Sequence, residues 1–153
     1  MNLKPKQKRM KQFTLFSGVA NAAYQKLVDL VIGNQYTYSD IVKNFGEPKS
    51  TGGQDWKTFQ DLNYDGVQLG FEGGEFCQCL VTSDKFTMFG EGGTGGIKVG
   101  DNIDAVKKLR DARPEKCGAD SYKLFTKSDW VVAQVYFNPA TNVITKIKVG
   151  QMY

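Results

Sequence analysis

The sequence of 153 residues contains no histidine, only four prolines and only three cysteines. Without histidine, the commonest general base and the usual partner of a catalytic serine or cysteine are missing. A zinc site would need all three thiolates and a carboxylate, at a spacing that no common zinc motif uses. No apolar run approaches the about 20 residues that a membrane-spanning helix needs. We therefore expect no enzyme activity, no cofactor and no transmembrane segment.

The three cysteines are Cys77, Cys79 and Cys117. Cys117 could form a disulfide with either of the other two, which would leave one free thiol. Alternatively, all three cysteines are reduced and half-buried. Cys77 and Cys79 would share one face of a strand. Their match to Ile144 and Lys146 in the repeat described below places that face near the surface. A redox-active pair there would make the protein a cysteine-dependent enzyme or redox protein.

Positive charge is concentrated near the N-terminus, where the first eleven residues include five basic ones and no acidic one. They are Lys4, Lys6, Lys8, Arg9 and Lys11. The rest of the chain holds 15 basic and 16 acidic residues and is nearly neutral. Nucleic-acid-binding domains usually carry a basic face on their folded part. We therefore expect no nucleic-acid partner.

Residues 1–16 form a basic tail or a signal-like segment. A short apolar stretch follows the basic residues, and Ala20-Asn21-Ala22 fits the small-x-small cleavage pattern of secreted proteins. The alternative is that the tail leads into a helix over residues 17–32. Ser17 would cap that helix, and a stripe at 3.6-residue spacing would form its buried face.

A second, shorter helix is predicted after residue 37. Thr37 and Asp40 have the spacing of a capping box, in which each side chain accepts a hydrogen bond from the other's backbone. Ile41, Val42 and Phe45 would face the core. Gly46 stands where a left-handed stop belongs, and Pro48 excludes continuation.

Three strands are predicted next, over residues 56–62, 67–71 and 76–82. Asp65-Gly66 and Gly73-Gly74 supply the tight turns between them. A glycine-rich linker over 90–96 precedes a short helix that Asp101 would cap. Strands over residues 121–126, 130–137 and 142–149 follow.

The two halves align on four residue pairs, namely Val42 with Val106, Phe59 with Phe125, Gln68 with Gln134, and Phe71 with Phe137. This similarity predicts an α+β fold with two repeats of a short helix followed by a three-stranded antiparallel meander, plus an additional N-terminal helix. Residues 17–89 would hold that helix and the first repeat. Residues 97–153 would hold the second repeat.

Residues 33–48, ending in Phe45-Gly46-Glu47-Pro48, resemble the opening of the SmpA/OmlA lipoproteins and of the β-lactamase-inhibitor-protein family. Residues 97–101 resemble the same opening again. The resemblance implies tandem units of helix and antiparallel sheet, an extracytoplasmic location, and a role in binding other proteins. The lipobox cysteine is absent, and the inhibitor's cysteine pairs do not map onto this chain. The resemblance therefore implies a fold and a general binding role.

Aromatic residues are the best candidates for interface anchors, although each could equally pack in the core. They are Tyr36, Tyr38, Trp56, Trp130 and Tyr136. The sequence predicts a non-enzymatic, exported protein-binding module, in the periplasm or secreted, whose partner is another protein. A cytoplasmic interaction or immunity-type protein is the alternative, and a cysteine-dependent enzyme or redox protein is the second. The oligomeric state stays open.

Overall fold

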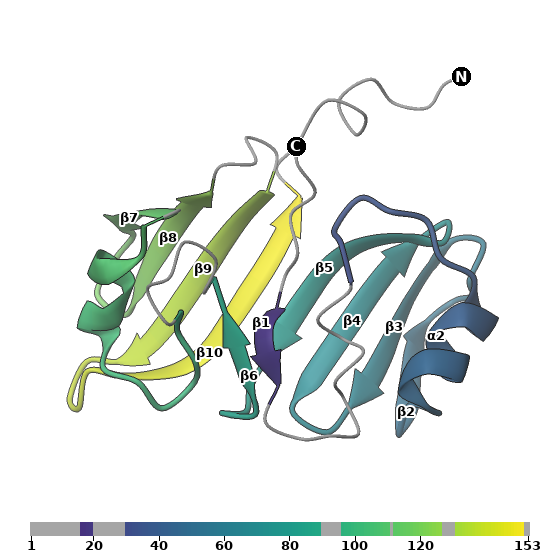
Figure 1. The fold of residues 1–153 in the computed structure, drawn as a ribbon, viewed down its shortest axis with the longest axis horizontal. Coiled ribbons are helices and arrows are strands. Elements are labelled where there is room, and N and C mark those ends of the chain that lie inside the picture. The colour runs from purple at the N-terminus through teal and green to yellow at the C-terminus, as the bar shows by residue number, and fades with distance from the viewer. Residues whose placement is uncertain (1–15, 20–29, 90–95, 111, 127–130, 152–153) are drawn as a thin grey trace.

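Eight antiparallel strands form one continuous sheet in the computed structural model, which describes residues 16–19, 30–89, 96–110, 112–126 and 131–151 (Figure 1). The strands lie in the order β2-β3-β4-β5-β10-β9-β8-β7. Their bounds are β2 Ser50–Gly53, β3 Phe59–Tyr64, β4 Val67–Glu72, β5 Glu75–Val81, β7 Ala112–Lys116, β8 Ser121–Thr126, β9 Val131–Asn138 and β10 Val143–Gln151. The seam between β5 and β10 joins the first four strands to the last four.

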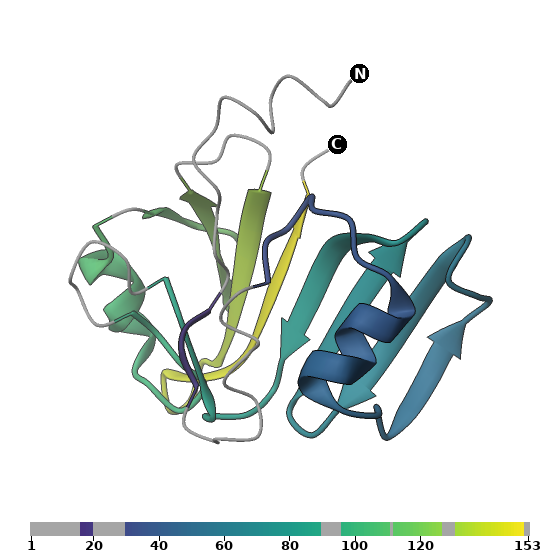
Figure 2. The ribbon, with the colours of Figure 1, turned by 45° about the vertical axis from the view of Figure 1, so that its right-hand side comes forward.

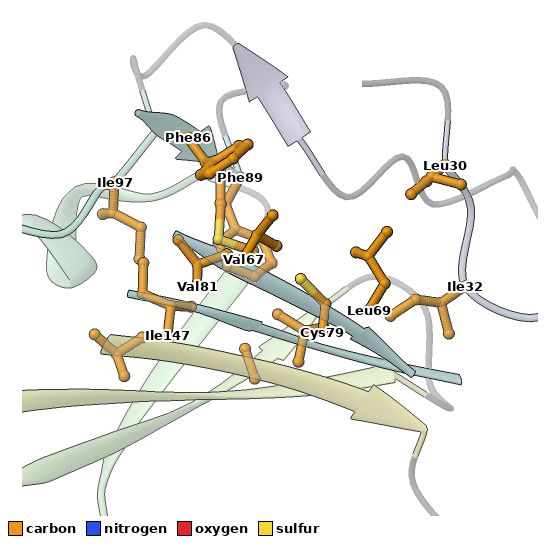
Figure 3. Packing of buried hydrophobic residues seen from close by; sticks show 14 of the residues in the cluster. Leu30, Ile32, Val67, Leu69, Cys79, Val81, Phe86, Phe89, Ile97 and Ile147 are labelled. Atoms are coloured by element: carbon orange, nitrogen blue, oxygen red, sulfur yellow. The ribbon is translucent and has the colours of Figure 1, made fainter. Parts of the chain in front are cut away.

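One side of the sheet is covered by all the remaining elements (Figures 1 and 2). These are the helix α2 (Tyr38–Phe45), the 3₁₀ helix η2 (Ile103–Lys108) and the two-stranded pair of β1 (Phe16–Val19) and β6 (Phe86–Met88). The core lies between this layer and the sheet. Figure 3 shows side chains from β4, β5 and β10 meeting those of the segments around Leu30, Phe86 and Ile97.

The predicted fold class is wrong in its organisation: the structure is one large sheet and not two helix-plus-meander repeats with an extra N-terminal helix. Of the predicted helix over 17–32, Phe16–Val19 is a strand paired with β6, and Leu30–Ile32 are not helical. Residues 20–29 lie outside the described part. Leu30 and Ile32 are both buried, and an apolar run this short fits an extended segment as well as a helix.

The second half differs from the prediction as well. Its helical segment is the six-residue 3₁₀ helix η2, which ends at Lys108 and is followed by Leu109 as its C-cap. In the large sheet, two strands were not predicted, β2 and β7, and they form its two edges. Pro114 lies in β7, where the lack of a backbone N–H is tolerated because an edge strand has a neighbour on one side only.

Several local predictions are confirmed, although Asn102 and not Asp101 caps the second helical segment. Thr37 Oγ1 accepts from the Asp40 amide at 3.0 Å, and Asp40 Oδ2 accepts from the Thr37 amide at 3.2 Å, which forms the predicted capping box. The hydrogen bonds from Thr37 lower the pKa of Asp40. Gly46, at φ +88°, ends the helix as predicted. The hairpin through Gly66 is also confirmed, with Tyr64 paired to Val67.

Candidate protein-binding face

The side of the sheet opposite the helices is not covered by any described helix or strand (Figures 1 and 2). We call it the open face. Strand register aligns its side chains in rows across the sheet. One row joins Gln68, Leu80, Lys148, Gln134 and Lys123, and a second joins Asp61, Gly70, Gln78, Gly150 and Val132. These residues alternate with the buried ones, as expected for a sheet with one wet face.

Two hollows lie on the open face at the seam. The first has a volume of about 230 Å³ and is lined by Cys77, Gln78, Lys123, Val132, Ala133, Gln134, Lys148 and Gly150. The second has a volume of about 210 Å³ and is lined by Gln68, Gln78, Cys79, Leu80, Tyr136, Lys146 and Lys148. Gln78 and Lys148 line both hollows, so the two lie side by side. Gly150 leaves room because it places no side chain over the strand.

The lining of the hollows is cationic. Lys123, Lys146 and Lys148 are exposed, and no acidic residue of the described ranges lines either hollow. Among the described residues, none of these lysines has a carboxylate within ion-pair distance. The Lys146 ammonium lies 4.6 Å from the centre of the Tyr136 ring, a cation–π contact that also holds the two side chains together.

Glutamine amides supply the polar groups between the lysines. Gln68 Nε2 donates to Asn63 Oδ1 at 2.7 Å, and Gln134 Nε2 donates to Ser121 Oγ at 3.2 Å. Within the described part of the chain, the Gln78 side chain makes no hydrogen bond of its own. The hollows are therefore bordered by amides at fixed positions as well as by positive charge.

The first half of the open face carries an acidic group instead. Asp61 lies on β3 beside Gly70, where an added Cβ would come within 3.2 Å of Asp61 Oδ1. That oxygen is buried and has no hydrogen-bond partner in the described structure. Desolvation raises the pKa of Asp61. The open face is thus cationic on β8–β10 and acidic on β3.

The structure brings three of the predicted aromatic anchors together, but on the covered side. The ring centres of Trp56 and Phe71 are 4.6 Å apart, and those of Tyr38 and Trp56 are 5.5 Å apart. Trp56 Nε1 donates to the carbonyl of Tyr36 at 3.2 Å. These three aromatics are half-buried against the core. Tyr136 alone lies on the open face, and Trp130 lies outside the described residues.

All three cysteines are free thiols in the structure, and Cys117 is exposed. The predicted surface position of Cys77 and Cys79 is wrong, because both are buried. A register shift between Gly70 and Phe71 changes the alternation along β5, so that Cys79 joins the core. Burial raises the pKa of Cys77 to about 11 and also raises the pKa of Cys79.

The residues that line the hollows, apart from Tyr136 and the cysteines, were not among the predicted site residues. A signal for them exists in β10, where Lys146, Lys148 and Gly150 alternate with Ile147 and Val149. This alternation predicts one buried and one cationic face. It does not predict that β10 pairs with β5, and that pairing is what creates the hollows.

No group of three or more potential metal ligands occurs among the described residues. None of the helices in the described ranges is long and apolar enough to cross a membrane.

No protein-family model matches the sequence, and no curated protein matches it either. Three solved chains are similar to this one, including the following two. One is an extracellular protein containing an SCP domain from Bacillus anthracis, with 17% sequence identity and a TM-score of 0.51. The aligned region covers 78% of this chain and 43% of the Bacillus anthracis chain. The other is a cysteine-rich secretory protein from Staphylococcus aureus, with 12% sequence identity and a TM-score of 0.50. The aligned region covers 78% of this chain and 44% of the Staphylococcus aureus chain.

This chain therefore spans less than half the length of the solved structures that it matches. At such low identity the similarity shows a shared fold alone. Neither neighbour is an SmpA/OmlA lipoprotein or a β-lactamase-inhibitor protein, and the resemblance to those families stays a prediction.

Proposed function

We propose that this chain is an exported, non-enzymatic protein-binding module whose partner docks on the open face. The observation that carries the proposal is a single sheet with one covered side and one bare, hollowed side. Antiparallel sheets commonly leave one face to solvent and line it with polar side chains. Here that face also has hollows at its centre, bordered by glutamines, lysines and Gly150.

The size of the open face suits a protein partner. Seven strand spacings make the sheet about 34 Å wide, and strands of six residues make it about 20 Å tall. The resulting area of about 700 Å² is close to the about 800 Å² that each partner contributes to a standard interface.

Two further observations support the proposal. Both structural neighbours are extracellular or secretory proteins, which supports export. The lack of histidine and the raised pKa of Cys77 support a non-enzymatic role, because a thiol with a pKa of about 11 is almost wholly protonated near neutral pH. The similarity to these neighbours does not support a narrower assignment to the β-lactamase-inhibitor class.

Hydrogen-exchange footprinting of the full chain, alone and with a partner captured from the host's extracellular fraction, tests the docking surface. We expect added protection in β5, β9 and β10, with no added protection in α2. Protection confined to α2 and the loop around Trp56, or the absence of a specific partner, would overturn the proposal.

Export has its own test, which is the natural protein's N-terminal residue and its location in the cell. Recovery of the protein outside the cytoplasm is the expected result. Cleavage after Ala22 is not expected, because it would remove β1, which pairs with β6. An intact Met1 on a protein recovered only from the cytoplasm would favour the alternative of a cytoplasmic interaction protein.

A further inference from the structure

The two hollows at the seam define the chemistry of the partner, an inference that rests on the proposed function. We infer that the open face binds an extended acidic segment of the partner protein, which lies along β10 with its carboxylates on Lys146, Lys148 and Lys123. The charge of the hollows, their geometry and their polar lining each support this ligand class.

The first argument is charge complementarity. Three exposed lysines line the hollows. Among the described residues, no acidic side chain lines them and no carboxylate pairs with any of the three. Elsewhere in the described structure, Lys85, Lys98 and Lys107 each pair with an aspartate. The lysines of the open face therefore keep their charge available for carboxylates from outside the chain.

The second argument is spacing. Lys146 and Lys148 are two residues apart on one strand, with regular pairing to Tyr136 and Gln134. Their stems are therefore about 6.6 Å apart, which is also the distance between alternate side chains of an extended peptide. Lys123 lies two strands away from Lys148, at about 10 Å. An extended segment with acidic residues at alternate positions matches the first pair. Lys123 stands in the same row as Lys148, with Gln134 between them, so its long side chain can lean toward the carboxylate that meets Lys148.

The third argument is the polar floor. Gln78 lies between the two hollows, and its side chain makes no hydrogen bond within the described structure. Gly150 lets a partner backbone approach closely. A peptide offers amide donors and acceptors that Gln78 can bind, whereas a simple anion offers acceptors alone. This combination favours an acidic peptide over a free anion or a phosphate-bearing surface.

The test uses the full chain and a synthetic peptide of alternating Glu and Thr, about twelve residues long so that it exceeds the nine residues of β10. NMR titration at low salt should shift amide signals of β5, β9 and β10. Lys146→Glu/Lys148→Glu should weaken binding at least about tenfold, since both contacts become repulsive. Lys43→Glu/Lys57→Glu, an equal change of exposed lysines away from the open face, should alter binding less than about twofold.

Two further probes separate the sources of negative charge. A peptide of alternating Gln and Thr should not bind, and vesicles containing an anionic phospholipid should bind no more tightly to the wild type than to Lys146→Glu/Lys148→Glu. Acidic-peptide binding that survives this double substitution would overturn the inference, because it would place the contact on other basic residues of the chain. Vesicle binding that depends on the two lysines would overturn it in favour of a membrane surface.

The natural partner distinguishes this inference from the proposed function. Suppose that the partner protects the open face but binds Lys146→Glu/Lys148→Glu with unchanged affinity, while Val132→Trp, a bulky block beside Gly150, abolishes binding. The acidic segment is then wrong and the docking face stands. If neither variant affects a partner that binds the chain, the docking face itself is wrong.

Discussion

The two halves of the sheet are covered in different ways. Beside β2–β5, the α-helix α2 packs with an aromatic cluster in which Phe71 contacts the rings of Tyr36, Trp56 and Phe76. Beside β7–β10, a single 3₁₀ helix packs over mostly aliphatic side chains. Among the described aromatic rings, Tyr122 is the only one that contacts Phe137. One sheet can therefore be stabilised by large rings in one half and by branched side chains in the other.

The open face shows the opposite asymmetry. The half without the aromatic cluster carries the three lysines of the hollows, and the half with it carries Asp61. On the proposed function, the ring packing of the core and the charged groups of the docking surface therefore lie in different halves of the sheet. Four predictions test this separation, and they begin with the one of largest effect.

Truncation of the aromatic cluster should cost more than truncation in the other half. Phe71→Ala should lower the free energy of unfolding by about 4 kcal/mol, as a buried phenylalanine usually does. Phe137→Ala should cost about 1 kcal/mol less, because it loses one ring contact where Phe71 loses three. Urea denaturation followed by circular dichroism measures both, with Phe71→Leu as a substitute if Phe71→Ala does not fold. An equal or larger loss for Phe137→Ala would contradict the comparison.

The rate of thiol labelling should be lower by about two orders of magnitude for Cys77, in the first half, than for an ordinary exposed thiol. Raising the pKa of Cys77 from 9.0 to about 11 lowers its thiolate fraction near neutral pH about 100-fold. Cys117 is exposed and should react first, while Cys77 and Cys79 should react only after denaturation. Mass spectrometry of protein labelled with iodoacetamide gives the order. Rapid labelling of Cys77 or Cys79 in the native protein would restore the alternative of a cysteine-dependent enzyme.

Loss of a cap should matter more for α2 than for η2. Thr37→Ala removes a hydrogen bond to the Asp40 amide within a two-sided capping box and should cost about 1 kcal/mol. Asn102→Ala removes a single bond to the Asp104 amide in a shorter helix and should cost about half as much. Urea midpoints of the two variants give the comparison, and equal losses would show that both helical segments depend on their caps alike.

The smallest effect should come from Asp61. Its pKa is raised in the folded state, so ionisation of Asp61 opposes folding. The folded state therefore loses stability as the pH rises from 3.8 through the folded pKa. Asp61→Asn should therefore be more stable than the wild type near neutral pH, by a few tenths of a kcal/mol because the carboxyl is partly solvated. The gain should vanish below pH 3.8. Lys123→Gln, an exposed change in the other half, should show no such pH dependence, and a constant difference for Asp61→Asn would contradict the desolvation argument.

The sequence predicted what depends on neighbouring residues and missed what depends on distant ones. The capping box of Thr37 and the turn at Gly66 need only a few adjacent residues, and both are confirmed. The edge strand β2 has the sequence Ser-Thr-Gly-Gly, which shows no apolar alternation, and it is a strand because β3 pairs with it. Tyr136 was proposed for an interface and lies on the open face, but the hollows beside it depend on the pairing of β5 with β10, which no local pattern shows.

The central place of β10 has a consequence for how the chain reaches its native state. β10 follows every other described strand in the sequence, yet it lies between β5 and β9, and Gln78 pairs with Gly150 across about 70 residues. Such distant pairing slows folding, since a large loop must close before any contact forms. During synthesis, β5 therefore stays an unprotected strand edge until β10 has emerged, and an unprotected edge invites pairing with other chains. A slow refolding phase and aggregation before its completion are the kinetic signature expected of this strand order.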